Sequence, residues 1–192
     1  MPPRYKVSRD EILHAAFAIL EERGRDAVTA RSIAEKLSIS PRPIYSFFPS
    51  MDKVHEALVD ECAKVMQGYM THPYTEEAFL NMGVGFVAFY REKLHVAEFM
   101  EKYWSSEGIQ KVEEKVFDDF YERIKNQEHY RKITRKQLWQ IYQKMSFFTY
   151  GLVMHYRTSG LNLTQEEIIS LLDETGEALI VHQLWVNGGK PS

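Results

Sequence analysis

The apolar residues of this chain recur every three or four positions almost throughout, and this helical period constrains the fold more than any other feature. Alternating runs typical of strands are nearly absent. Three segments open with capping boxes, in which a hydroxyl residue precedes Glu or Gln by three positions: Ser8 with Glu11, Thr134 with Gln137, and Thr164 with Glu167. The sequence therefore predicts an all-α fold.

Further start and stop signals divide the chain into about nine helices. Thr29, Ser40, Ser50 and Thr75 each suit a helix N-cap, and glycine or proline marks the breaks. The predicted helices lie near residues 8–23, 30–37, 41–48, 51–70, 76–93, 95–105, 109–128, 134–158 and 165–187. We expect a helix-turn-helix domain over residues 1–50 and a larger helical domain over residues 51–192.

Charge is distributed unevenly along the chain. Residues 1–50 hold 8 Lys and Arg against 6 Asp and Glu, whereas the remainder holds 16 against 21. A mildly basic N-terminal part on an acidic body is consistent with a protein that brings one end to nucleic acid, although exposed charges are usually only a solvated face.

Other sequence features exclude several classes of protein. A single cysteine, Cys62, cannot form an internal disulfide, no apolar stretch is long enough to span a membrane, and no signal peptide is evident. We therefore expect a cytoplasmic protein. There is no nucleophile–base pair and no glycine-rich phosphate loop, and His55-Glu56 lacks the second histidine of a zinc-binding helix. The sequence predicts no enzyme, catalytic residue, metal site or cofactor.

Residues 29–48 have the pattern of a helix-turn-helix. Ile33, Ala34 and Leu37 form one apolar face of a short helix, and Ile39 lies in a three-residue turn. In the next helix Ile44, Tyr45 and Phe48 can pack on the first, while Pro41 and Pro43 suit a first turn, where a missing amide costs little.

A short second helix can enter the major groove of duplex DNA with its first residues at base edges. We expect Arg42 and Ser46 to contact bases and Pro43 to contact a thymine methyl group. The basic arm of Arg4, Lys6 and Arg9 supports DNA binding, and phosphate contacts suit other side chains. The complete predicted DNA-binding set is Thr29, Arg31, Ser40, Arg42, Pro43, Tyr45, Ser46 and Lys53.

With these residues in view, the segment 8–58 resembles the DNA-binding domain of the TetR family. The resemblance rests on several spacings at once: Ala15-Ala16-Phe17, Gly24, Thr29, Ile33-Ala34, Ile39-Ser40, Tyr45-Ser46-Phe47-Phe48, Lys53 and Leu58. It implies three N-terminal helices, a fourth helix that links them to the body, and a body that forms a homodimer and binds a small-molecule effector.

The sequence also departs from this family. Ser38 stands where glycine is usual in the turn, which costs roughly 1–2 kcal/mol if the left-handed conformation is kept. Pro49 and Met51 stand where a basic residue is common, so phosphate contacts are lost. Arg42 and Pro43 replace smaller residues, so an operator sequence cannot be taken from relatives.

Aromatic and methionine side chains recur through the body at helical spacing. They suit a pocket for an apolar or aromatic effector, although an aromatic stripe at helical spacing is more often an ordinary core, so both interpretations are open at this point. Glu113-Glu114 and Asp118-Asp119 are typical of a solvated face. The predicted effector-binding set is Met66, Tyr69, Phe86, Phe89, Tyr90, Phe99, Tyr103, Phe120, Phe147, Tyr150 and Met154.

The last two predicted helices have apolar residues on two sides, and both sides must be buried. One side can face the body and the other a twofold-related copy, giving a four-helix seam, or the last helix can be buried within a single chain. The predicted dimer contacts are Leu172, Leu179, His182, Trp185 and Val186.

These features together predict a TetR-type regulator, a repressor that an apolar or aromatic effector releases from a palindromic double-stranded operator. The alternative is a helical small-molecule-binding protein that has lost DNA binding, which the residues at positions 49 and 51 favour. Salt-dependent binding of duplex DNA separates the two, because only the regulator requires it.

Overall fold

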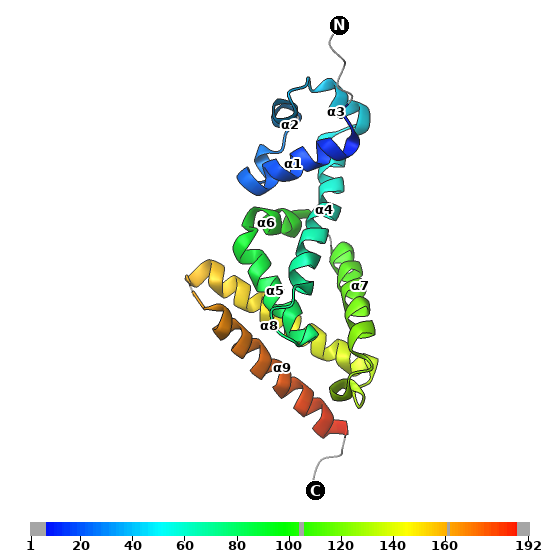
Figure 1. Ribbon diagram of the computed structural model, residues 1–192, viewed down its shortest axis with the longest axis vertical. Coiled ribbons are helices and arrows are strands. Elements are labelled where there is room, and N and C mark those ends of the chain that lie inside the picture. The colour runs from blue at the N-terminus through cyan, green and yellow to red at the C-terminus, as the bar shows by residue number, and fades with distance from the viewer. Residues whose placement is uncertain (1–6, 104–105, 161, 188–192) are drawn as a thin grey trace. The chain divides into compact units, whose positions relative to one another are not determined.

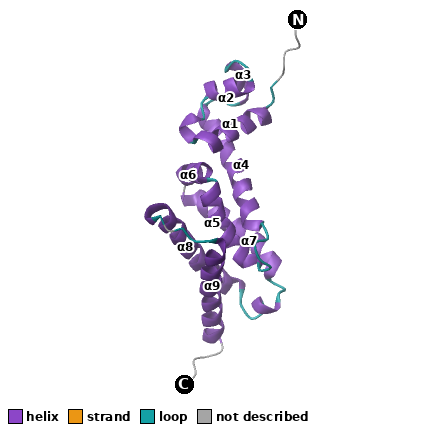
Figure 2. Ribbon diagram, turned by 60° about the vertical axis from the view of Figure 1, so that its left-hand side comes forward, coloured by secondary structure: helices purple, strands orange, loops and turns teal. Residues whose placement is uncertain are grey.

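The computed structural model describes residues 7–103, 106–160 and 162–187, and their side chains apart from those of 103–113, 129 and 187. Over these residues the chain is helical without a strand (Figures 1 and 2), which confirms the predicted all-α fold. Each observed helix lies within four residues of its predicted bounds. The helices are α1 (Arg9–Arg23), α2 (Ala30–Leu37), α3 (Arg42–Phe47), α4 (Met51–Thr71), α5 (Ala78–Glu92), α6 (Leu94–Tyr103), α7 (Ser106–Ile124), α8 (Arg135–Ser159) and α9 (Gln165–Asn187).

The predicted capping boxes are present at the starts of three helices. The Ser8 and Thr134 hydroxyls accept from the amides of Glu11 and Gln137, whose side chains accept from the cap amides in return. Thr164 and Glu167 make the same pair of hydrogen bonds before α9.

The structure corrects the prediction that Ser40 caps the helix after the turn. Helix α3 begins at Arg42 with Pro41 at its N-cap, and no side chain caps it. Pro41 has a fixed φ near −65°, as the start of a helix requires, so the backbone enters α3 without a hydroxyl cap.

The described chain divides into two compact units. The head unit comprises the residues up to Met66 and the stretch from Glu92 that holds α6, and the body unit comprises Gln67–Arg91 and the chain from Ser106. The head unit therefore extends beyond residue 50 and includes most of α4. Its core is the buried apolar face of α1, α2 and α3, namely Ile12, Ala16, Leu20, Ile33, Ala34 and Ile44.

Within the head unit, α6 and the residue before it contact α1 and α4. Lys93, just before α6, pairs with Glu21 of α1, and the Phe99 ring meets the His55 ring edge-on at a centroid distance of 6.0 Å. Burial, together with the charge of Arg25, lowers the pKa of His55, so this imidazole packs in its neutral form at neutral pH.

In the body unit, α9 runs back along α8 (Figure 1), and the end of α4 crosses α5. A Cβ placed on Gly85 would lie 2.2 Å from the Tyr69 carbonyl oxygen, so the two backbones touch at this position. At Gly83 the Leu172 side chain fills the space instead, at 3.0 Å. Gly85 thus lets the backbones of α4 and α5 touch, and Gly83 leaves room for the Leu172 side chain. None of the described helices is long and apolar enough to cross a bilayer.

Candidate functional site

The turn between α2 and α3 has the geometry of a helix-turn-helix. Ser38 adopts the left-handed conformation at φ 54°, ψ 41°, and its amide donates to the Ala34 and Glu35 carbonyl oxygens. The Ile39 amide donates to the Ala34 carbonyl at 3.0 Å. The condition under which Ser38 was expected to cost energy, a left-handed conformation in the turn, is therefore met. The turn thereby closes α2 and redirects the chain into α3.

One side of α3 is buried and the other is open to solvent. Ile44 and the following Phe48 are buried as predicted, whereas 51% of Tyr45 is exposed, so the prediction that Tyr45 packs on α2 is wrong. Arg42 and Ser46 are exposed and Pro43 is half-buried. The side chains predicted to meet base edges are thus brought together on one six-residue helix.

The remaining predicted DNA contacts flank α3 and already have polar partners. Thr29 caps α2 in a capping box with Ser32, whose hydroxyl also donates to the Ala27 carbonyl at 2.6 Å. The Arg31 guanidinium donates to Glu35 at 2.9 Å, and the Lys53 ammonium pairs with Glu56. Because these ion pairs are exposed, each is worth little and can be exchanged for phosphate. Ser40 is exposed in the turn.

The start of α1 also contacts the end of the helix-turn-helix. The Arg9 guanidinium lies 4.9 Å from the centre of the Phe48 ring, a cation–π contact that fixes the residue following α3. Arg4 and Lys6, the other members of the predicted arm, lie outside the described residues. Phe47 is also exposed on α3, and helical spacing alone did not separate it from its buried neighbour Phe48.

A pocket of about 80 Å³ opens in the body unit where α4 ends, α5 begins and α7 passes. Of the predicted effector-binding residues only Phe120 lines it. The other lining residues were absent from the predicted set, because that set consists of aromatic and methionine side chains, whereas most of this wall is aliphatic or polar. They are Gln67, Met70, Thr71, Ala78, Asn81, Met82, Val116, Asp119 and Arg123.

The other predicted effector-binding residues are dispersed. Tyr69, Phe86, Phe89 and Tyr90 form an aromatic cluster with successive ring centres 4.9–5.8 Å apart, and Phe89 and Tyr90 are buried in it. This arrangement is a packed core around the end of α4.

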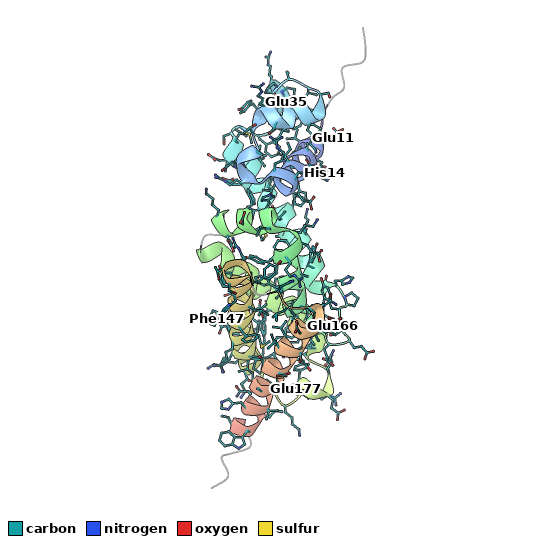
Figure 3. The ribbon with its side chains drawn as sticks, turned by 90° about the vertical axis from the view of Figure 1, so that its left-hand side faces the viewer. Glu11, His14, Glu35, Phe147, Glu166 and Glu177 are labelled. Carbon is teal, nitrogen blue, oxygen red and sulfur yellow. The ribbon has the colours of Figure 1, made fainter. Side chains whose placement is uncertain are left out.

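The predicted residues outside that cluster do not come together either. Met66 and Phe99 are buried in the head unit, and the Tyr103 side chain lies outside the described residues. On α8, Phe147 is 75% exposed (Figure 3), Tyr150 is 44% exposed and Met154 is half-buried.

The predicted dimer contacts fall into two groups. Leu172 is 1% exposed within a single chain and packs against Gly83, so it has no surface left for a partner. Trp185 and Val186 are exposed, His182 lies beside Trp185 with ring centres 6.2 Å apart, and Leu179 is half-buried. The described part of the chain holds no group of three His, Cys, Asp or Glu residues that suits a metal ion.

The chain is similar to known proteins in the sequence of its N-terminal segment and in its fold. Residues 12–58 fit the model of the bacterial regulatory proteins of the tetR family. The fold is similar to a TetR-like transcriptional regulator from Rhodococcus sp. RHA1, with TM-score 0.55, 15% identity, and coverage of 90% of this chain and 94% of that one. It is also similar to a TetR variant from Acinetobacter baumannii AYE solved with minocycline, with TM-score 0.57, 14% identity and 97% coverage of both chains. No curated protein sequence matches the chain.

Proposed function

We propose that this chain is a homodimeric repressor released from its operator by a small molecule, because residues 12–58 fit the tetR family model and its fold is similar to that of TetR-like regulators. The observation that carries the proposal is the helix-turn-helix of α2 and α3, whose second helix presents Arg42, Tyr45 and Ser46 to solvent. A twofold dimer would set two such helices into successive major grooves of a palindromic site.

Arg42 is the side chain on which base recognition most depends. Its guanidinium is exposed at the first position of α3, and such a group can donate two hydrogen bonds to one guanine. Lys53 and Thr29 flank α3 in sequence and would meet phosphates, which set affinity and orientation but not base preference.

Helix α4 provides the physical link to the effector. It starts in the head unit, three residues after Phe48, and its last residues, from Gln67, line the pocket of the body unit. A molecule in that pocket would touch the same helix that begins beside the helix-turn-helix. It would act by preferring the conformation in which the dimer binds DNA poorly.

The first test selects duplexes from a random pool with the wild-type protein and then compares variants on the selected site by fluorescence anisotropy. Arg42→Ala should weaken binding by the dimer about 30-fold or more, because roughly 1–3 kcal/mol is lost in each of two half-sites, and should relax the base preference at one position per half-site. Arg131→Ala, an exposed arginine of the body unit, is the matched control and should bind like wild type. Wild-type affinity in the Arg42 variant would contradict base contact by this residue.

The second candidate function is a helical receptor that no longer binds DNA, and Pro49 and Met51 favour it. Salt dependence decides between the two, because phosphate contacts release counterions on binding. For the regulator, Lys53→Ala should lower the slope of log affinity against log salt by about 2, one contact in each subunit of the dimer, while leaving the selected sequence unchanged. The absence of any salt-dependent duplex binding by the wild-type protein would favour the receptor.

A further inference from the structure

Part of the lining of the body unit's pocket is apolar. Its walls include Met70 at the end of α4, Met82 of α5 and Phe120 of α7, and Phe120 is held by stacking on Phe79 with ring centres 5.2 Å apart. With a volume of about 80 Å³ it is roughly half the size of a cavity of about 150 Å³ that accommodates benzene. The pocket therefore suits a compact apolar group rather than a large ring system.

The most buried polar side chain of the pocket is already satisfied. The Asn81 carbonyl oxygen accepts from the Thr75 amide at 2.7 Å and from the Thr75 hydroxyl at 3.0 Å, and its amide group donates to the Thr75 carbonyl at 2.9 Å. Asn81 thus holds the loop before α5 in place. A polar group on a ligand must find its partners elsewhere on the pocket.

Two opposite charges stand at the pocket's edge on α7. Asp119 and Arg123 are both exposed lining residues, one helical turn apart, and no ion pair joins either to another described residue. The neighbouring Asp118, by contrast, is engaged by Arg135. Residues four positions apart rise about 6 Å along a helix and lie on the same face of α7, so one small ligand head can reach both side chains.

We propose that this pocket binds a small zwitterion with a compact apolar side group. The apolar group would lie against Met70, Met82 and Phe120, the ammonium group would pair with Asp119, and the carboxylate would accept from the Arg123 guanidinium. The proposal rests on the proposed function in one respect only: the ligand is an effector if the chain regulates transcription.

The test uses three probes with the same branched apolar group. L-leucine has both charges, 4-methylpentanoate has only the carboxylate, and 3-methylbutylamine has only the ammonium. Isothermal titration calorimetry on the full-length wild-type protein should show leucine binding at least fivefold more tightly than either single-charge probe. Comparable affinity for all three probes, or no binding of any of them, would overturn the proposal.

Charge-removing variants assign the two contacts. Asp119→Asn should weaken leucine binding at least fivefold without weakening 4-methylpentanoate, and Arg123→Gln should weaken leucine without weakening 3-methylbutylamine. Asp118→Asn, one residue away and outside the pocket lining, is the matched control and should leave leucine binding unchanged. Unchanged leucine affinity in both the Asp119→Asn and the Arg123→Gln variant, with thermal unfolding showing that they are folded, would overturn the assignment of these two contacts.

Duplex binding, measured in the same samples, separates failure of this inference from failure of the proposed function. Sequence-selective duplex binding without leucine binding would overturn the zwitterion site and leave the regulator intact. Leucine binding that depends on both Asp119 and Arg123, without duplex binding, would support the site and overturn the regulator.

Discussion

Ser38 shows how a single residue sets the angle of the helix-turn-helix at an energetic cost. Its left-handed conformation places a Cβ close to the following carbonyl oxygen, which a glycine would avoid. The Ser38 and Ile39 amides donate to carbonyl groups at the end of α2, and these hydrogen bonds depend on the backbone alone. The turn therefore does not require a serine side chain. It forms although serine is less favourable than glycine at this position.

We expect Ser38→Gly to stabilise the protein by about 0.5–1 kcal/mol. The gain is smaller than the strain removed, because glycine also makes the unfolded chain more flexible. Urea denaturation followed by circular dichroism measures the change. Ser38→Ala keeps the Cβ and is the matched control, which should show no gain; equal stabilisation by alanine and glycine would contradict the strain argument.

Two buried groups that lose a proton at high pH, the Cys62 thiol and the Tyr130 hydroxyl, make the free energy of unfolding depend on pH in the alkaline range. Burial raises the pKa of the Cys62 thiol to about 12, and burial, with Glu77 and Asp173 adding to it, raises the pKa of the Tyr130 hydroxyl to about 12. Both groups keep their protons in the folded protein at pH values where the unfolded chain begins to lose them. Folding is then opposed by rising pH, because the native state binds more protons than the unfolded state.

These two groups should accordingly contribute no pH dependence up to about pH 8 and should lower the stability increasingly above pH 9. For Cys62 alone the loss at pH 10 is about 1.4 kcal/mol, since its ordinary pKa of 9.0 lies one unit below. Denaturation midpoints of wild type and Cys62→Ala at pH 8 and pH 10 measure this. The variant should lose less stability between the two pH values, and an identical loss would exclude Cys62 as a contributor.

At the scale of helices, the boundaries were predictable because local chemistry fixes them. Ser8, Thr134 and Thr164 each cap a helix through residues three positions away, and such signals can be read along the chain. The pocket was not predictable in this way. Asp119 and Met70 lie far apart in sequence and meet only through packing, and Asp119 has the solvent-exposed placement expected of a charged residue.

The crossing of α4 and α5 depends on Gly85. A side chain at this position would displace the backbone of Tyr69 and Met70, and Met70 also lines the pocket. Gly85→Ala should cost at least 1–3 kcal/mol, the usual effect of overpacking. Gly68→Ala is the matched control, because a Cβ there meets nothing within 4 Å and the change should stabilise the helix by up to about 1 kcal/mol. Thermal unfolding measures the stability of both variants. A Gly85→Ala variant as stable as wild type would show that α4 and α5 can move apart at little cost.

At the scale of the whole molecule, the exposed apolar side chains of α8 and α9 are the candidates for association of the body unit with a second copy. Phe147 and Tyr150 of α8 and Val181, Trp185 and Val186 of α9 are exposed. The sequence predicted that these two helices have two apolar sides, but it assigned Leu172 to the side that meets a partner. Leu172 has the same helical spacing as a seam residue, and only tertiary packing directs it inward to Gly83.

Val181→Glu tests whether these side chains form the dimer seam. With 64% of its side chain exposed, Val181 tolerates a charge in an isolated chain, whereas an unpaired carboxylate buried between two copies is costly. We expect sedimentation equilibrium to show a dimer for wild type and a folded monomer for the variant. The variant should also lose most of its affinity for a palindromic site, because two half-sites bound by linked subunits gain effective concentration that separate monomers lack. Lys132→Glu, exposed before α8, changes the charge in the same direction by more and should remain dimeric. If Val181→Glu stays a dimer, the subunits associate through a different surface.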